Sequence, residues 1–158
     1  MNELTTYRTV DLVYDREDFN PDAADWKRQV ELFDAHGMEL RGIKSDLDVQ
    51  RYLQIQREGR LIYVTARDVS GVLQGYSSHF WHRHMHFNVR VAQDDAWYVI
   101  PGLRRLGVGR KLREFALREL ELAGVKYVYG RLKTAHPHDE SMTGLGYVPW
   151  ETTWIKQL

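Results

Sequence analysis

The chain has 158 residues, enough for one domain with a hydrophobic core, and its 22 basic residues balance 22 acidic ones. This balance argues against a nucleic-acid binder or a protein of acidic membrane surfaces, because both carry a basic excess. Cysteine is absent, which excludes disulfides, thiolate metal sites and a cysteine nucleophile. Since no apolar run fits a signal peptide or a membrane span, we expect a single cytoplasmic domain over residues 1–158.

The first part of the chain predicts a strand and two helices. Residues 5–14 are rich in β-branched and aromatic types with a period near two, which indicates a strand. Asn20-Pro21 fits an N-cap and a first helical residue, and the helix that follows is expected to end at Gly37. Ser45, with Asp48 three residues later, predicts the start of a second helix.

The middle of the chain predicts an antiparallel meander. Its strands are residues 60–67, 72–81 and 86–100, separated by turn residues, and the opening strand should be the last member of this sheet. A long amphipathic helix follows, then a strand at 125–132, a short helix or turn, and a final strand at 148–158. This order of elements predicts a mixed α/β (α+β) domain.

The segment from Ala96 to Gly124 organises the chain. It combines a buried strand, a break at Pro101-Gly102, a basic loop and the long helix. Arg104, Gly107 and Gly109 form the pattern R-x-x-G-x-G where the loop becomes the helix. Glycine lets main-chain amides turn toward a ligand, and the helix N-terminus is partly positive, so the loop suits a phosphate or pyrophosphate. It is neither the P-loop nor the G-x-G-x-x-G dinucleotide fingerprint.

Val99-Ile100-Pro101, the R-x-x-G-x-G loop and the leucine-rich helix together resemble the acyl-CoA-binding segment of the GNAT N-acetyltransferases. The resemblance implies a central, mixed, mostly antiparallel sheet of about six to seven strands with about four flanking helices, and two strands splayed apart at the CoA cleft. A further resemblance, through His86, Asp95 and Gly146-Tyr147 to the C-terminus, is to GNAT proteins encoded by bacteriophages. In that case the location would be the host cytoplasm.

The resemblance implies acetyl-CoA as co-substrate, and we expect no metal. Main-chain amides of the loop would face the pyrophosphate, basic side chains would neutralise phosphate charge, and the backbone of the preceding strand would pair with pantetheine. The residues expected to bind CoA are Trp97, Tyr98, Val99, Arg104, Arg105, Leu106, Gly107, Val108, Gly109, Arg110 and Lys111. The alternative is an ordinary strand-to-helix turn with solvated arginines and core aromatic residues.

Acetyl transfer needs a neutral amine, and therefore a group that accepts a proton. The family often uses a carboxylate on the strand before the loop, where Asp94 and Asp95 lie here, on opposite faces by strand alternation. Asp95 is expected to share its face with Gln93, Trp97 and Val99. Gln93 stands where some histone-acetylating relatives place a glutamate, and it cannot act as a base. Asp95 is thus the candidate base; the alternative is a pair of solvated aspartates.

The departing thiolate needs a proton, which the family often takes from a tyrosine four residues before the glycine of its L-G-[FY] motif. Leu145-Gly146-Tyr147 is that motif here, and the fourth residue back is Met142, which cannot donate a proton. The side chains that could replace the tyrosine are His136, His138, Ser141 and Tyr147. The alternative roles are a helix cap for His138 and a solvated side chain for His136.

Histidines gather in one predicted bend. In a strand, His82, His84 and His86 would share a face and could bind zinc, copper or nickel. No glutamate lies in the bend, and we expect a surface hairpin with scattered histidines instead of a metal site.

These patterns predict an acyl-CoA-dependent N-acetyltransferase that works by direct attack in a ternary complex on a primary amine of a protein or a small molecule. The alternative is a GNAT-fold protein, of viral origin or not, that binds CoA or a partner with weak or no transferase activity. The identity of the acceptor amine stays open. We expect no nucleic-acid or membrane partner, and a homodimer could form if the C-terminal strand, with Trp150 and Trp154, pairs across subunits.

Overall fold

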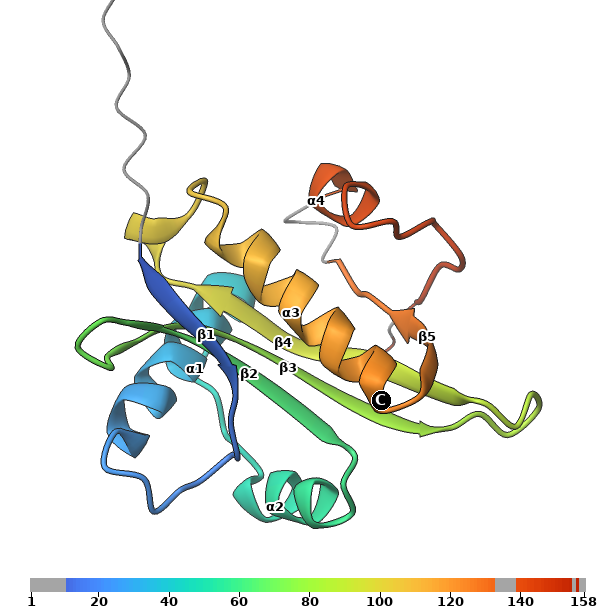
Figure 1. The fold of residues 1–158 in the computed structure, drawn as a ribbon, viewed down its shortest axis with the longest axis horizontal. Coiled ribbons are helices and arrows are strands. Elements are labelled where there is room, and N and C mark those ends of the chain that lie inside the picture. Colours follow the sequence, from blue (N-terminus) through green and yellow to red (C-terminus); the bar gives the residue numbers. More distant parts are fainter. Residues whose placement is uncertain (1–10, 133–138, 155, 157–158) are drawn as a thin grey trace, which may run out of the picture.

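The computed structural model describes residues 11–132, 139–154 and 156. These residues form a mixed α/β fold in which one five-stranded sheet lies between helices (Figure 1). Helices α1 (Trp26–Arg41) and α2 (Val49–Arg57) cover one face of the sheet, and α3 (Val108–Leu122) covers the other. A short 3-10 helix, η1 (Pro101–Leu103), precedes α3, and α4 (Asp139–Thr143) follows the last strand.

The sheet has the strand order β1-β2-β3-β4-β5. The first three pairs are antiparallel, whereas β4 and β5 are parallel because α3 connects them. The predicted meander, with the opening strand at its edge, is confirmed. The strands are β1 (Leu12–Arg16), β2 (Leu61–Asp68), β3 (Leu73–Arg83), β4 (Arg90–Val99) and β5 (Val125–Tyr129).

Each face of the sheet has its own hydrophobic core. Under α1 and α2 the core is aromatic, and Phe33 stacks on Tyr76 with ring centroids 4.3 Å apart. Under α3 it is aliphatic, with Leu112, Ala116 and Leu120 recurring at helical spacing and fully buried. No helix in the described part of the chain is long and apolar enough to cross a bilayer.

Helix α1 begins later than predicted. Asn20 does not cap it: the side-chain oxygen of Asn20 accepts from the Asp22 amide at 3.0 Å and closes a local turn. The helix starts at Trp26 after Asp25, whose carboxylate is held by Arg67 at 2.6 Å. The ion pair joins the start of α1 to β2, which is distant in sequence.

The expected end of α1 at Gly37 is also wrong, because the helix continues to Arg41 and Gly42 ends it with a left-handed φ of 68°. Gly37 serves close packing: a Cβ there would lie 2.8 Å from the carbonyl oxygen of Ile43. The second helix starts at Val49, with Asp48 as its N-cap, and not at Ser45. The Ser45 hydroxyl instead donates to the Phe33 carbonyl at 2.7 Å.

The predicted C-terminal strand does not form over residues 148–154. These residues include types that favour strands, but they pair with no described strand. Trp150 and Trp154 are 79% and 90% exposed. In the described part of the chain the sheet consequently has five strands, where six or seven were expected. Only residues 12–14 of the predicted first strand at 5–14 lie in β1, and residues 1–10 are outside the described part.

Candidate functional site

Strands β4 and β5 separate halfway along β4. They pair only from Arg90 to Gln93, and β5 ends at Tyr129. Beyond that point β4 keeps β3 on one side, and no described strand lies on the other. The Arg131 guanidinium donates to the Gln93 side-chain oxygen at 2.9 Å, which ties the two strands together where they begin to diverge.

The open edge of β4 presents main-chain groups of Trp97 and Val99. The Ile100 amide donates to Gln74 of β3 at 3.1 Å, so Ile100 faces β3. Since main-chain groups alternate along a strand, those of Val99 and Trp97 face away from β3. The Val99 carbonyl accepts from the Arg104 side chain at 2.8 Å. An extended ligand could therefore add to this edge through backbone hydrogen bonds.

The loop after β4 leads into the N-terminus of α3, which no side chain of the described residues caps. Gly107 is the N-cap residue, with a left-handed φ of 79° that favours glycine. The first helical amides, from Val108 to Arg110, have no carbonyl in the preceding turn to bond. Uncapped amides and the positive helix end fit a phosphate group.

The second glycine of the loop pattern has a different role. A Cβ on Gly109 would lie 2.9 Å from the indole ring of Trp97. Gly109 therefore lets α3 pack closely on β4, while Gly107 supplies the backbone conformation. The pattern R-x-x-G-x-G combines a conformational and a packing requirement.

The four basic side chains of the loop differ in their partners. Arg104 binds both carboxylate oxygens of Glu39, at 2.8 and 2.9 Å, so it joins the loop to α1. Arg110 pairs with Glu114 at 2.8 Å. Arg105 and Lys111 are exposed and have no ion-pair partner among the described residues. They are the cations of the loop left to neutralise a phosphate.

A β-bulge on β4 lies at Asp95. Ser78 of β3 pairs with Ala96 and His79 pairs with Asp94, so Asp95 is the extra residue between them. Asp95 faces α2, opposite Asp94, as strand alternation predicts. Trp97 and Val99 face α3 instead, and the expectation that all three share a face is wrong.

Asp95 accepts two hydroxyl hydrogen bonds on one oxygen. The Tyr52 hydroxyl donates to Oδ2 at 2.5 Å and the Ser78 hydroxyl at 2.7 Å. Among the described residues none bonds Oδ1, and the side chain is exposed. Burial, with the nearby Asp95 carboxylate, raises the pKa of Tyr52, so Tyr52 stays a donor. Asp95 thus offers a free oxygen to an ammonium group or a proton.

Asp94, on the opposite face, is committed to an ion pair beneath α3. Its Oδ2 lies 2.5 Å from the Arg113 guanidinium, whose side chain is 1% exposed. Arg113 also stacks on Trp97, with the guanidinium carbon 4.7 Å from the ring centroid. His79 lies 3.8 Å from the same carboxylate, and burial lowers its pKa to about 4. Asp94 is therefore structural.

Arg113 was not predicted from the sequence. The available signal was an arginine beside Leu112 on the apolar face of an amphipathic helix, together with an aspartate on the preceding strand. Pairing the two requires the register of α3 on β4, which sequence does not give.

The segment that ends in Leu145-Gly146-Tyr147 packs on this pair. The Met142 sulfur lies 3.4 Å from the Arg113 guanidinium and is buried. The Tyr147 ring lies 5.5 Å from the Arg113 carbon, and burial raises the pKa of its phenol. Ser141 is exposed. His136 and His138 lie outside the described residues.

The three hairpin histidines take different roles. His82 borders a pocket beside α2, and the ring of His84 stacks on Phe87 with centroids 4.6 Å apart. The Nδ1 atom of His84 accepts from the His86 amide at 3.2 Å. In the described part of the chain no three His, Asp or Glu side chains are placed to hold one metal ion.

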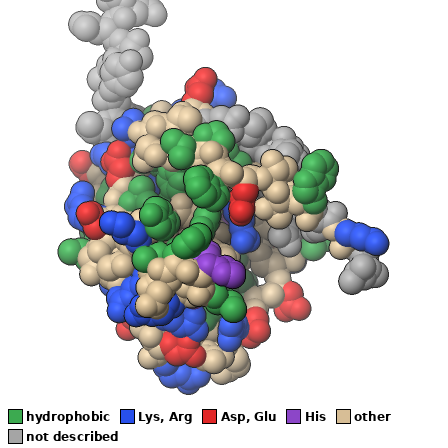
Figure 2. All heavy atoms as spheres, turned by 90° about the vertical axis from the view of Figure 1, so that its right-hand side faces the viewer, with side chains coloured by type: hydrophobic (Ala, Val, Ile, Leu, Met, Phe, Trp, Pro, Cys, Tyr) green, Lys and Arg blue, Asp and Glu red, His purple; other side chains and the backbone are tan. Residues whose placement is uncertain are grey.

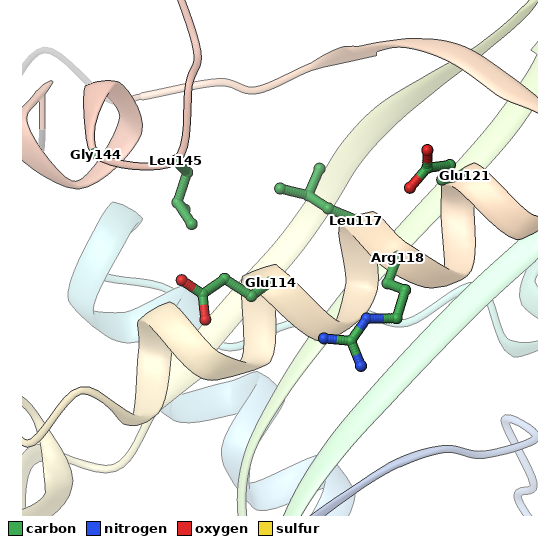
Figure 3. A pocket seen from close by; sticks show the side chains of 6 residues that line it. All are labelled: Glu114, Leu117, Arg118, Glu121, Gly144 and Leu145. Atoms are coloured by element: carbon green, nitrogen blue, oxygen red, sulfur yellow. The ribbon is translucent and has the colours of Figure 1, made fainter.

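An open pocket of about 390 Å³ lies between the outer face of α3 and the turn after α4. Figure 3 shows Leu145 extending from that turn toward α3, with Glu114 and Glu121 at the helix. Arg118 lies beside these carboxylates, so the pocket carries charges of both signs, and no residue of the loop from Arg104 to Lys111 lines it.

The sequence of residues 26–143 matches the model of the acetyltransferase (GNAT) family. Among curated proteins, no sequence matches this chain significantly.

Solved structures with a similar fold include three acetyltransferases. A GNAT family acetyltransferase from Staphylococcus aureus has a TM-score of 0.71 at 15% identity, over 93% of this chain and 98% of that one. Ribosomal-protein-alanine N-acetyltransferase from Brucella melitensis has a TM-score of 0.71 at 14% identity, over 94% and 99%. Glucosamine-6-phosphate N-acetyltransferase from Arabidopsis thaliana has a TM-score of 0.66 at 12% identity, over 92% and 98%. Because the family match spans most of its length, this chain belongs to the GNAT acetyltransferase family.

Proposed function

We propose that this protein transfers an acetyl group from acetyl-CoA to a primary amine by direct attack in a ternary complex. The observation that carries the proposal is the open edge of β4 beside the uncapped N-terminus of α3, in a chain of this family. The backbone of Trp97 and Val99 would hold pantetheine. The amides after Gly107, with Arg105 and Lys111, would hold the pyrophosphate.

In this reaction the amine nitrogen bonds the acetyl carbon as the carbon–sulfur bond breaks. Asp95, directly or through water, would accept the amine proton, because its Oδ1 is free and its Oδ2 is fixed by Tyr52 and Ser78. The Val99 amide on the open edge would polarise the thioester carbonyl. Of the candidates to protonate the departing thiolate, Ser141 and Tyr147 lie in the described part of the chain. Burial raises the pKa of Tyr147, which keeps its phenol protonated but makes it a weaker acid.

A second function, CoA binding with weak or no transfer, is favoured by one observation. Met142 occupies the position where the family often has a tyrosine that acts as general acid. The Met142 sulfur is buried against Arg113. The bacteriophage origin and the homodimer stay predictions. Sedimentation of the purified chain would measure its oligomeric state.

Two measurements on the same preparation separate the two functions. Calorimetry with CoA measures donor binding, and release of free thiol from acetyl-CoA is followed with amino acids, amino sugars, polyamines and peptides. Transfer predicts thiol release that requires one of these amines. CoA binding with no amine-dependent thiol release would contradict the transferase proposal and support the second function.

A further inference from the structure

A pocket of about 380 Å³ lies beside Asp95, between α2 and strands β2 to β4. Its walls include Tyr52 and Ile55 of α2 and Phe80 of β3. This volume falls in the lower part of the range of small-molecule sites, about 300–1,000 Å³. Charged side chains of both signs gather on the lower part of the molecule in Figure 2, at the height where Figure 1 places α2.

Two of the four charges that line the pocket are already compensated. Asp48 caps α2 by accepting from the Arg51 amide at 3.0 Å, so the helix N-terminus balances its charge. Arg60 forms an ion pair with Glu58. Asp48 and Arg60 therefore need no charged ligand to compensate them.

The other two charges, on Arg51 and Asp95, have no opposite charge within ion-pair distance among the described residues. Among the described residues, the Arg51 guanidinium donates to the neutral Gln54 side chain alone, at 3.1 Å. Asp95 accepts from two neutral hydroxyls and keeps Oδ1 free. A ligand that neutralised both would carry a cation toward Asp95 and an anion toward Arg51.

We propose that this pocket binds the acceptor and that the acceptor is a small primary amine bearing a carboxylate or a phosphate, with its ammonium group at Asp95 and its anionic group at Arg51. This inference rests on the proposed transferase function, since it names the substrate class of the same site. This arrangement of one negative and one positive charge also disfavours polyamines, because Arg51 would repel a second ammonium group. Tyr52 and Phe80 would cover the carbon skeleton that joins the two charged groups.

Matched pairs of amines test the proposal. Phosphoethanolamine is compared with ethanolamine, and an amino acid with its amide, so that each pair differs in the anionic group and the two pairs separate phosphate from carboxylate. We expect kcat/KM to favour the anionic member of at least one pair by about 10- to 100-fold, the effect of one charge-assisted hydrogen bond. Faster acetylation of the neutral members, of spermidine or of a peptide would overturn the inference.

The variant Arg51→Gln should remove this preference, mainly by raising KM for the anionic amines. Arg57→Gln is the matched control, because Arg57 is an exposed arginine of the same helix that does not line the pocket. An unchanged preference in Arg51→Gln, or an equal loss in Arg57→Gln, would overturn the assignment of Arg51.

Calorimetry with the CoA-bound protein separates this inference from the proposed reaction, because it requires no turnover. Binding of phosphoethanolamine or the amino acid that Arg51→Gln weakens by about 10- to 100-fold, without any acetylation, would support the pocket and contradict the transferase function. Acetylation without any preference for an anionic amine would support the transferase function and contradict the pocket's proposed ligand.

Discussion

Two neighbouring aspartates of β4 have different roles because their side chains lie on opposite faces of the sheet. Strand alternation alone predicts that Asp94 and Asp95 face opposite sides, and this is confirmed by their contacts with Arg113 and Tyr52. The bulge at Asp95 then reverses the alternation for the residues that follow. A bulge depends on the pairing with β3, so the face of Asp95 relative to Trp97 could not be derived from the sequence of β4.

Asp95→Asn should lower kcat at neutral pH by about 100-fold or more, the contribution typical of a general base. The amide oxygen can still accept from Tyr52 and Ser78, so the fold and CoA affinity should be unchanged. The pH dependence of kcat and calorimetry with CoA measure the two effects, with the exposed Asp18→Asn as control. A wild-type pH–rate profile in Asp95→Asn would remove Asp95 from the mechanism.

His79 makes stability depend on pH. Burial lowers the pKa of His79 to about 4, below the ordinary value of 6.5 that applies in the unfolded chain. Between these values the unfolded chain binds a proton that the folded protein does not, so the free energy of unfolding falls as pH decreases through this window. From the two pKa values, the loss is on the order of 3 kcal/mol by pH 4.

His79→Gln should abolish this part of the pH dependence. Urea unfolding at pH 7 and pH 4.5 gives the change in the free energy of unfolding for the wild type, for His79→Gln and for the exposed control His86→Gln. Subtraction cancels the other titrating groups. Equal pH dependence in all three proteins would show that His79 is protonated in the folded state.

At the scale of elements, the Asp94–Arg113 pair fixes α3 on β4. Arg113 fills the space between Trp97, Met142 and Tyr147, so three segments meet at one guanidinium. Hydrophobic periodicity correctly predicted α3, but it gave no sign that a buried arginine interrupts the apolar face of this helix. Arg113 belongs to the interface between α3 and the sheet, and its partner Asp94 is known only from the packing at that interface.

Arg113→Met should destabilise the protein by about 3–5 kcal/mol, because it leaves the Asp94 carboxylate buried without a counter-charge. The double variant Asp94→Asn/Arg113→Met should recover much of that loss, since both charges are removed. Free energies of unfolding in urea measure both. A double variant as unstable as Arg113→Met would show that packing of Arg113, and not its charge, holds α3 in place.

For the whole molecule, the sequence predicted the strand meander, the long helix and the loop that enters it, because these depend on local periodicity and turn residues. Prediction from the sequence was wrong where contacts between residues distant along the chain determine the structure. The C-terminal residues have a strand-like composition, yet a strand also requires a pairing edge, and residues 148–154 have none in the described structure. Trp150 and Trp154 stay exposed as a result.

Ligand binding should be visible in the stability of the whole molecule. CoA at about 100 times its dissociation constant should raise the free energy of unfolding by about 2.7 kcal/mol, since it binds the folded protein only. Gly107→Glu should abolish this increase by placing a negative charge at the uncapped N-terminus of α3. Gly107→Gln is the matched control, because it strains the same left-handed backbone without the charge.

Both variants should lose about the same stability without CoA, about 1–3 kcal/mol for a non-glycine residue at this φ. The difference between the two variants in the free energy of unfolding with CoA present then separates the effect of the charge at the phosphate site from the effect of the strain in the loop. We expect Gly107→Gln to keep part of the CoA-dependent increase in unfolding temperature and Gly107→Glu to show none. A full CoA-dependent increase in Gly107→Glu would place the pyrophosphate away from the α3 N-terminus and contradict the proposed CoA site.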